Sequence, residues 1–102
     1  MKYLTMSYRK DSFFSLPAEE RKELGIATME HMVALMRTMG DKYTFYSAPR
    51  WGRGISIGEY ASLEDYSGSL QTPTFQFNHF ESYPLIESSL KEWEAYLAQM
   101  KA

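Results

Sequence analysis

The chain has 102 residues, of which 44% are hydrophobic and 16% aromatic, values that indicate one folded domain over residues 1–102. Its formal net charge of −2 gives no electrostatic attraction for nucleic acid or anionic lipid. Cysteine is absent, which excludes disulfides, thiolate metal sites and a cysteine nucleophile.

The first part of the chain predicts a strand followed by a long helix. Residues 2–9, KYLTMSYR, alternate between two kinds of side chain at the period of a half-buried strand. A helix is expected over residues 16–39, with Ser15 as its N-cap, acidic residues in its first turn and Gly40 at its end.

Two further strands and a short helix are expected next. Residues 42–48 and 54–60 have strand composition, and the intervening PRWGR contains turn residues, so a hairpin is predicted. Ser62 and Asp65 stand at capping-box spacing and begin a short helix.

The last part of the chain contains an aromatic segment and a helix. A strand is expected over residues 75–81, within TPTFQFNHFESYPLIE; the alternative is a bulge or a helical turn, which would reverse the assignment of side chains to faces. A capping box from Ser89 to Glu92 begins the final helix, which carries one apolar stripe. The members of this stripe are Leu90, Trp93, Leu97 and Met100.

This order of elements predicts an α+β fold. It corresponds to a ferredoxin-like split β-α-β antiparallel sheet with an added C-terminal helix. Helices in such a fold cover one face of the sheet, so the other face needs a cover, usually a second copy of the protein.

Strand alternation assigns side chains to the two faces. The aliphatic residues Leu4, Met6, Ile55 and Ile57 are expected on the helix-covered face. The opposite face would then carry small polar residues and tyrosines: Tyr3, Thr5, Ser7, Ser56, Gly58 and Tyr60, with Tyr46 added if Phe45 faces the helices. Such a face is suited either to a cavity enclosed between two protomers or to a wet dimer interface or partly solvated sheet.

At this level the chain resembles the dimeric α+β barrel superfamily, which includes antibiotic-biosynthesis monooxygenases, stress-responsive barrels, YCII-like proteins and muconolactone isomerases. The resemblance rests on element order and strand alternation, and on MKYL…SYR followed by SLPAEER, which is similar to the opening of small barrel-type domains. It implies a homodimer, paired sheet to sheet, with a ligand pocket either between the sheet and the helices of each subunit or between the sheets. It carries over no mechanism.

His79 is the leading candidate for general acid–base catalysis, because histidine titrates near neutral pH. In a regular strand it would share a face with Phe75 and Phe77 and point into the core, which leaves Gln76 and Asn78 facing the cavity. Tyr46 and Tyr60 are the other candidate proton handlers. Tyr3, Thr5, Ser7 and Ser56 are candidate ligand contacts.

The predicted hairpin tip offers a second group of candidate ligand contacts. Arg50 and Trp51 could bind an anionic ligand or the partner subunit, or form a solvated turn. The two histidines and the absence of carboxylates at ligand spacing predict neither a metal site nor a cofactor.

Two functions follow for this homodimer. The first is a cofactor-independent isomerase, cyclase or monooxygenase acting on a small, partly aromatic ligand. The second is a non-catalytic ligand-binding or structural dimer. No run approaches the roughly 18 apolar residues of a membrane span, and no signal peptide is expected. A cytoplasmic protein without membrane or nucleic-acid partners is therefore predicted.

Overall fold

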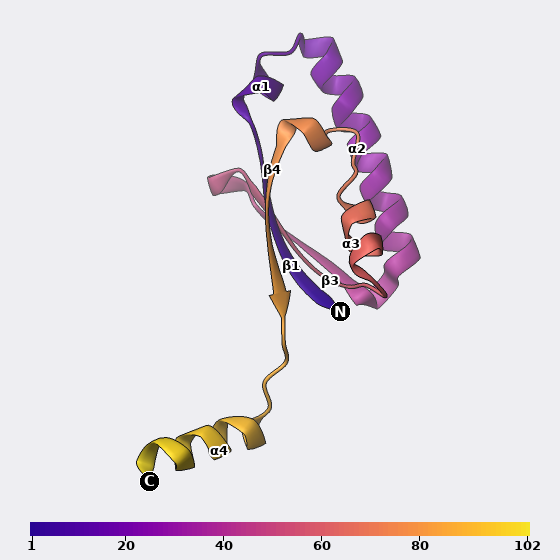
Figure 1. Cartoon of the computed structure of the whole chain (residues 1–102). Helices are drawn as coiled ribbons and strands as arrows, with labels where there is room; N and C mark the ends of the chain where they lie inside the picture. Colours follow the sequence, from indigo (N-terminus) through magenta and orange to yellow (C-terminus); the bar gives the residue numbers. More distant parts are fainter.

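The computed structural model describes residues 1–102 apart from the side chain of Trp51. Four strands form one antiparallel sheet in the order β2-β3-β1-β4, which makes the chain an α+β protein (Figure 1). This strand order and the order of the elements are compatible with a ferredoxin-like fold. The strands are β1 (Lys2–Arg9), β2 (Tyr43–Ala48), β3 (Arg53–Glu59) and β4 (Asn78–Leu85). The helices are α1 (Asp11–Phe14), α2 (Ala18–Met39), α3 (Leu63–Ser69) and α4 (Leu90–Lys101), with short 3-10 turns η1 (Gly40–Lys42), η2 (Pro49–Trp51) and η3 (Phe75–Phe77).

The helix boundaries follow local capping chemistry. The Ser62 hydroxyl accepts a hydrogen bond from the Asp65 amide at 3.1 Å, and the Ser89 hydroxyl accepts one from the Glu92 amide at 3.2 Å, so both predicted caps are confirmed. The prediction of Ser15 as an N-cap was wrong, because the chain forms the extra helix α1 and α2 begins after Pro17 instead. None of the described helices is long and apolar enough to cross a membrane.

The predicted strand over residues 75–81 was wrong in its first half. The Phe75 amide donates to the Thr72 carbonyl, and the Phe77 amide donates to the Thr74 carbonyl, both at 2.9 Å. These bonds turn the chain through η3 before β4 begins at Asn78. The register that assigned Phe77 and His79 to one strand face therefore does not apply.

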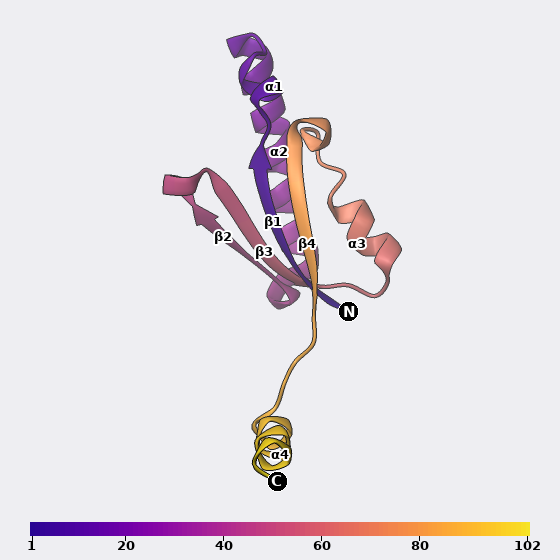
Figure 2. The same cartoon turned by 60° about the vertical axis from the view of Figure 1, so that its left-hand side comes forward.

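The helices lie on the face of the sheet that was predicted to be open. Figures 1 and 2 show α2 and α3 on the same side of the sheet. The buried Thr5 hydroxyl lies 2.6 Å from the hydroxyl of Tyr66 on α3, and the Tyr3 ring stacks on the Tyr66 ring at 4.1 Å. Side chains alternate along β1, so Tyr3 and Thr5 face the helices and Leu4 faces away from them.

The aliphatic face of the sheet is consequently uncovered in a single chain. Leu4 pairs with Ile57 and Met6 with Ile55 across β1 and β3, and all four are only half-buried. Their assignment to the helix-covered core was wrong, because aliphatic character predicts burial without specifying which surface supplies it. We call this side of the sheet, centred on these four residues, the aliphatic face.

The last helix stands apart from the rest of the chain. Beyond β4 the chain runs away from the sheet, and α4 lies at the far end of the molecule (Figure 2). The radius of gyration is 17.6 Å, against about 13 Å for a compact chain of this length. The buried hydrophobic side chains among the described residues are all aromatic: Tyr3, Phe13, Tyr43 and Tyr66.

The Tyr66 hydroxyl should be a main contributor to stability. It donates to the Ser82 hydroxyl, which leaves Thr5 to donate to Tyr66. We expect Tyr66→Phe to lower the free energy of unfolding by about 1–3 kcal/mol, because the buried Thr5 hydroxyl loses its partner. Urea denaturation measures this difference.

Tyr96→Phe is the matched control. The Tyr96 ring is exposed on α4, and its hydroxyl makes no hydrogen bond to the described residues, so the change should stay within about 0.5 kcal/mol. Equal effects of the two substitutions would contradict the assigned role of the Tyr66 hydroxyl.

Candidate ligand-binding cavity

A cavity of about 400 Å³ lies between the sheet and α2. Its sheet side is formed by the alternate residues of the central strands, which include Thr5, Ser7 and Ser56. Its helix side includes Met32 and Leu35 of α2. The cavity therefore has a hydroxyl-rich floor and an apolar roof, and its volume lies in the range of about 300–1,000 Å³ usual for small-molecule sites.

The structure brings about half of the candidate residues into this cavity. Tyr60, Thr5, Ser7, Ser56 and Asn78 all line it. It belongs to a single protomer and lies between its sheet and helices, which is one of the two positions that the resemblance implies. The cavity between two protomers, expected from strand alternation, stays a prediction. The face assignment was inverted, but the same hydroxyl-bearing face lines the cavity in both cases.

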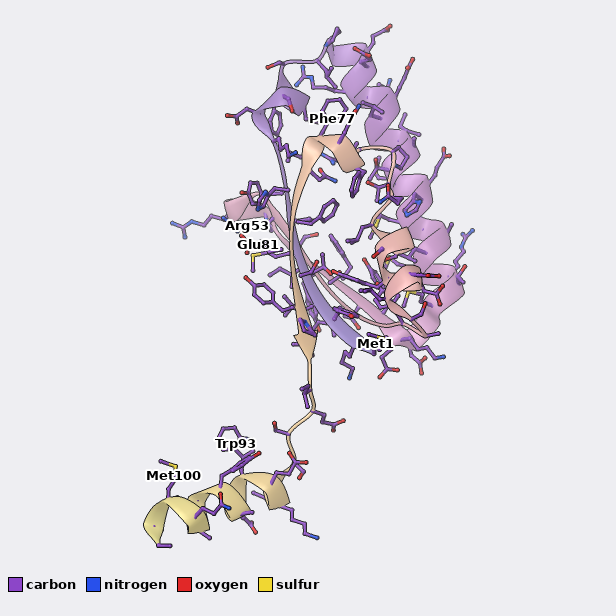
Figure 3. The ribbon with its side chains drawn as sticks, viewed as in Figure 1. Met1, Arg53, Phe77, Glu81, Trp93 and Met100 are labelled. Atoms are coloured by element: carbon purple, nitrogen blue, oxygen red, sulfur yellow. The ribbon has the colours of Figure 1, made fainter. Side chains whose placement is uncertain are left out.

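His79 and Tyr46 lie on the other side of the sheet. His79 is directly opposite Tyr8 in the β1–β4 register, with their ring centroids 4.8 Å apart. Its Nε2 is 4.0 Å from a carboxylate oxygen of Glu81, which Figure 3 shows on the side of the sheet away from α2. The prediction that His79 packs in the core beside Phe75 and Phe77 was wrong, because the strand face that His79 shares with Tyr8 is the one that the helices leave uncovered, and Phe75 and Phe77 lie in η3. Tyr46 is 55% exposed.

The remaining candidates lie outside the cavity. Tyr3 is buried beneath Tyr66. Gln76 is exposed in η3, and Arg50 is exposed in η2. Trp51 lies outside the residues whose side chains the structure describes.

Arg9 is a cavity residue that the sequence analysis did not identify. Its Nη1 donates to the hydroxyl of Thr74 and to the side-chain carbonyl of Asn78, both at 2.7 Å, and its guanidinium lies 4.5 Å from the centroid of the Phe13 ring. Burial lowers the pKa of Arg9, but arginine keeps its charge at neutral pH. Its position two residues after Ser7 places it on the same strand face and was the available signal.

Three tyrosines cluster at one end of the cavity. Tyr60 lies edge-on to Tyr66 with centroids 5.1 Å apart, and Tyr43 is buried nearby on β2. A Cβ at Gly58 would lie 2.8 Å from the Tyr60 hydroxyl, so glycine leaves room for this ring. Burial raises the pKa of both Tyr43 and Tyr60, an effect that Ser56 and Ser69 respectively oppose in part. Both phenols are therefore neutral at physiological pH and can donate hydrogen bonds.

Comparison of the chain with known protein families and with curated proteins gives no match. Among the described residues, no group of three or more His, Cys, Asp or Glu side chains could hold a metal ion. The function is therefore inferred from the geometry of the cavity and its charged and polar groups.

The buried tyrosines predict an alkaline loss of stability. Because burial raises the pKa of Tyr43 in the folded chain, the folded state keeps a proton that the unfolded state releases above about pH 10. The free energy of unfolding should be unaffected by this group at neutral pH and fall as the pH rises above about 10. Urea denaturation across this range, with phenolate absorbance, measures the effect. Tyr43→Phe should show a smaller alkaline loss than the wild type, and an identical loss would contradict the assignment.

Proposed function

We propose that the chain is a cytoplasmic homodimer of the dimeric α+β barrel type that binds a small, partly aromatic carboxylate in the cavity between its sheet and α2. The observation that carries the ligand class is Arg9. Both of its hydrogen bonds go to neutral acceptors on Thr74 and Asn78. Among the side chains that the structure describes, no carboxylate lies within 4.0 Å of it.

A half-buried guanidinium with only neutral partners favours an anionic ligand. Desolvation of a charge is compensated best by an opposite charge. Both of these hydrogen bonds use Nη1, so the donors on Nη2 and Nε remain for a carboxylate, which arginine binds in a two-point geometry. A negative charge on the ligand should therefore contribute most to its affinity for this site.

The rest of the cavity favours an aromatic body on that ligand. Phe45 and Phe80 line it together with Met32 and Leu35 of α2, which supply apolar and ring contacts. The hydroxyls of Thr5, Ser56 and Tyr60 provide a few hydrogen bonds that fix orientation.

The non-catalytic alternative is favoured over the isomerase, cyclase or monooxygenase. Acid–base catalysis needs a group with a pKa near the working pH. The described cavity lining contains no histidine or carboxylate, and burial raises the pKa of the lining residues Tyr43 and Tyr60, which makes them weaker proton donors. His79 lies across the sheet from the cavity.

The aliphatic face supports the homodimer. Leu4, Met6, Ile55 and Ile57 form two adjacent cross-strand pairs on it, and α2 and α3 both lie on the opposite side (Figure 1). An apolar sheet face needs a cover, and the same face of a second copy supplies one with matching chemistry and two-fold symmetry. The absence of cysteine is compatible with a reducing compartment.

Ligand binding can be tested with naphthoate as a probe and its neutral amide, naphthamide, as the comparison. We expect naphthoate to bind more tightly than naphthamide in calorimetric titration. Arg9→Gln should weaken naphthoate binding about 10- to 100-fold, the value of one charge-assisted hydrogen bond. The affinity of Arg9→Lys for naphthoate should lie between those of the wild type and Arg9→Gln, because lysine keeps the charge and loses the two-point geometry.

Arg37→Gln removes the same charge from the exposed surface of α2 and should leave naphthoate affinity unchanged. Circular dichroism of each variant establishes that it is folded. Equal binding of naphthoate and naphthamide to the wild type, or full affinity in a folded Arg9→Gln variant, would contradict the proposal.

A further inference from the structure

The helix α4 carries an apolar stripe that its own chain does not cover. The members of this stripe are Leu90, Trp93, Leu97 and Met100, and all of them are exposed. Trp93 is 63% and Met100 is 86% exposed. Figure 3 shows both side chains rising from the same side of the helix. We call this helix, together with the segment 86–89 that leads to it, the C-terminal arm.

A helix of this size needs a surface to pack against. It has 12 residues, and isolated helices shorter than about 12–15 residues are marginal in water. Its N-cap at Ser89 is formed, but capping contributes only about 1 kcal/mol. The apolar stripe is the feature through which tertiary packing can stabilise α4.

The arm leads away from its own domain. Ile86, the first residue after β4, is 92% exposed, and the arm extends the molecule to 63 Å in its longest dimension. In Figures 1 and 2 α4 lies beyond the end of β4 and apart from α2 and α3. In Figure 1 it reaches toward the side on which the aliphatic face lies.

The exposed area of the chain is too large for a monomer. Its accessible surface is 7822 Å², whereas a folded monomer of 11.9 kDa exposes about 6,000 Å². The excess of roughly 1,800 Å² is larger than the roughly 800 Å² that each partner buries in a standard interface. An area of this size is typical of obligate dimers, whose subunits are completed by one another.

We propose that the C-terminal arm is exchanged between two copies of this chain. The two copies pair through their aliphatic faces, and the apolar stripe of α4 in each copy packs against the other copy. This inference rests on the proposed homodimer and adds α4 as an element that stabilises it. Two-fold symmetry repeats the contact, so each dimer buries two arms. The exchanged arms and the paired sheets together account for both unpartnered apolar surfaces.

The first test measures mass in solution. Sedimentation equilibrium of the full chain should give about twice the mass of one chain, and Leu97→Asp should give the mass of a single chain. Ala95→Asp introduces the same charge on the opposite side of α4, between Glu94 and Tyr96 in sequence, and should remain dimeric. A monomeric wild type, or a dimer that Leu97→Asp leaves intact, would overturn the exchange.

The second test shows directly whose arm contacts which copy. The chain has no cysteine, so Gln99→Cys gives a single attachment site for a spin label on α4. Spin-labelled copies are mixed with isotope-labelled wild-type copies, and amide signals of the latter are recorded. Broadening of signals from β1 and β3 of the isotope-labelled copy supports exchange. If the signals stay unbroadened in the mixture and broaden only when both labels are on one chain, the arm folds back onto its own chain. That result would overturn the exchange.

Failure of the arm can be distinguished from failure of the ligand site. The cavity lies on the opposite side of the sheet within one protomer. A Leu97→Asp monomer that still binds naphthoate supports the exchange and shows that its fold is intact. If the Leu97→Asp variant stays dimeric and still binds naphthoate through Arg9, the exchange is overturned and the ligand site is not.

Discussion

The alternation of side chains along the two central strands is the constraint on which the rest of the structure depends. One face of β1 and β3 is aliphatic, with Leu4 opposite Ile57, and the other carries hydroxyls and tyrosines, with Thr5 opposite Ser56. In a two-layer α+β fold the helices cover only one face of the sheet. In this chain α2 and α3 cover the hydroxyl-bearing face (Figure 1), so the aliphatic face is left uncovered in a single chain.

This choice explains why the protomer contains a cavity. Aliphatic side chains on the helix-facing side would interdigitate with α2 and fill the layer, whereas Thr5, Ser56 and Gly54 are too small to reach Met32 and Leu35 across it. The space stays open as a lined cavity. The Thr5 hydroxyl on the sheet side of the cavity is fixed by its hydrogen bond with the Tyr66 hydroxyl. The half-buried Arg9 adds a positive charge that has no carboxylate within 4.0 Å among the described side chains.

Local signals in the sequence predicted most of the elements. Alternation gave the strands, and the capping serines at 62 and 89 gave the starts of α3 and α4. The face assignment failed because period-two alternation separates two faces but does not identify the covered one. His79 was misplaced because the strand face that it shares with Tyr8 is the one that the helices leave uncovered, and because residues 75–77 form a turn instead of extending β4. Arg9 was not identified as a cavity residue, although it lies on the same strand face as Ser7.

Methyl resonances of the isoleucines, recorded with a water-soluble paramagnetic agent, test the central claim that a second copy covers the aliphatic face. Ile55 and Ile57 lie on that face, whereas Ile26 is exposed on α2 and Ile86 is exposed beyond β4. We expect the agent to attenuate the Ile26 signals strongly and to leave those of Ile55 and Ile57 unaffected. Attenuation of Ile55 and Ile57 as strong as that of Ile26 would show that the aliphatic face is open to solvent and would contradict the account.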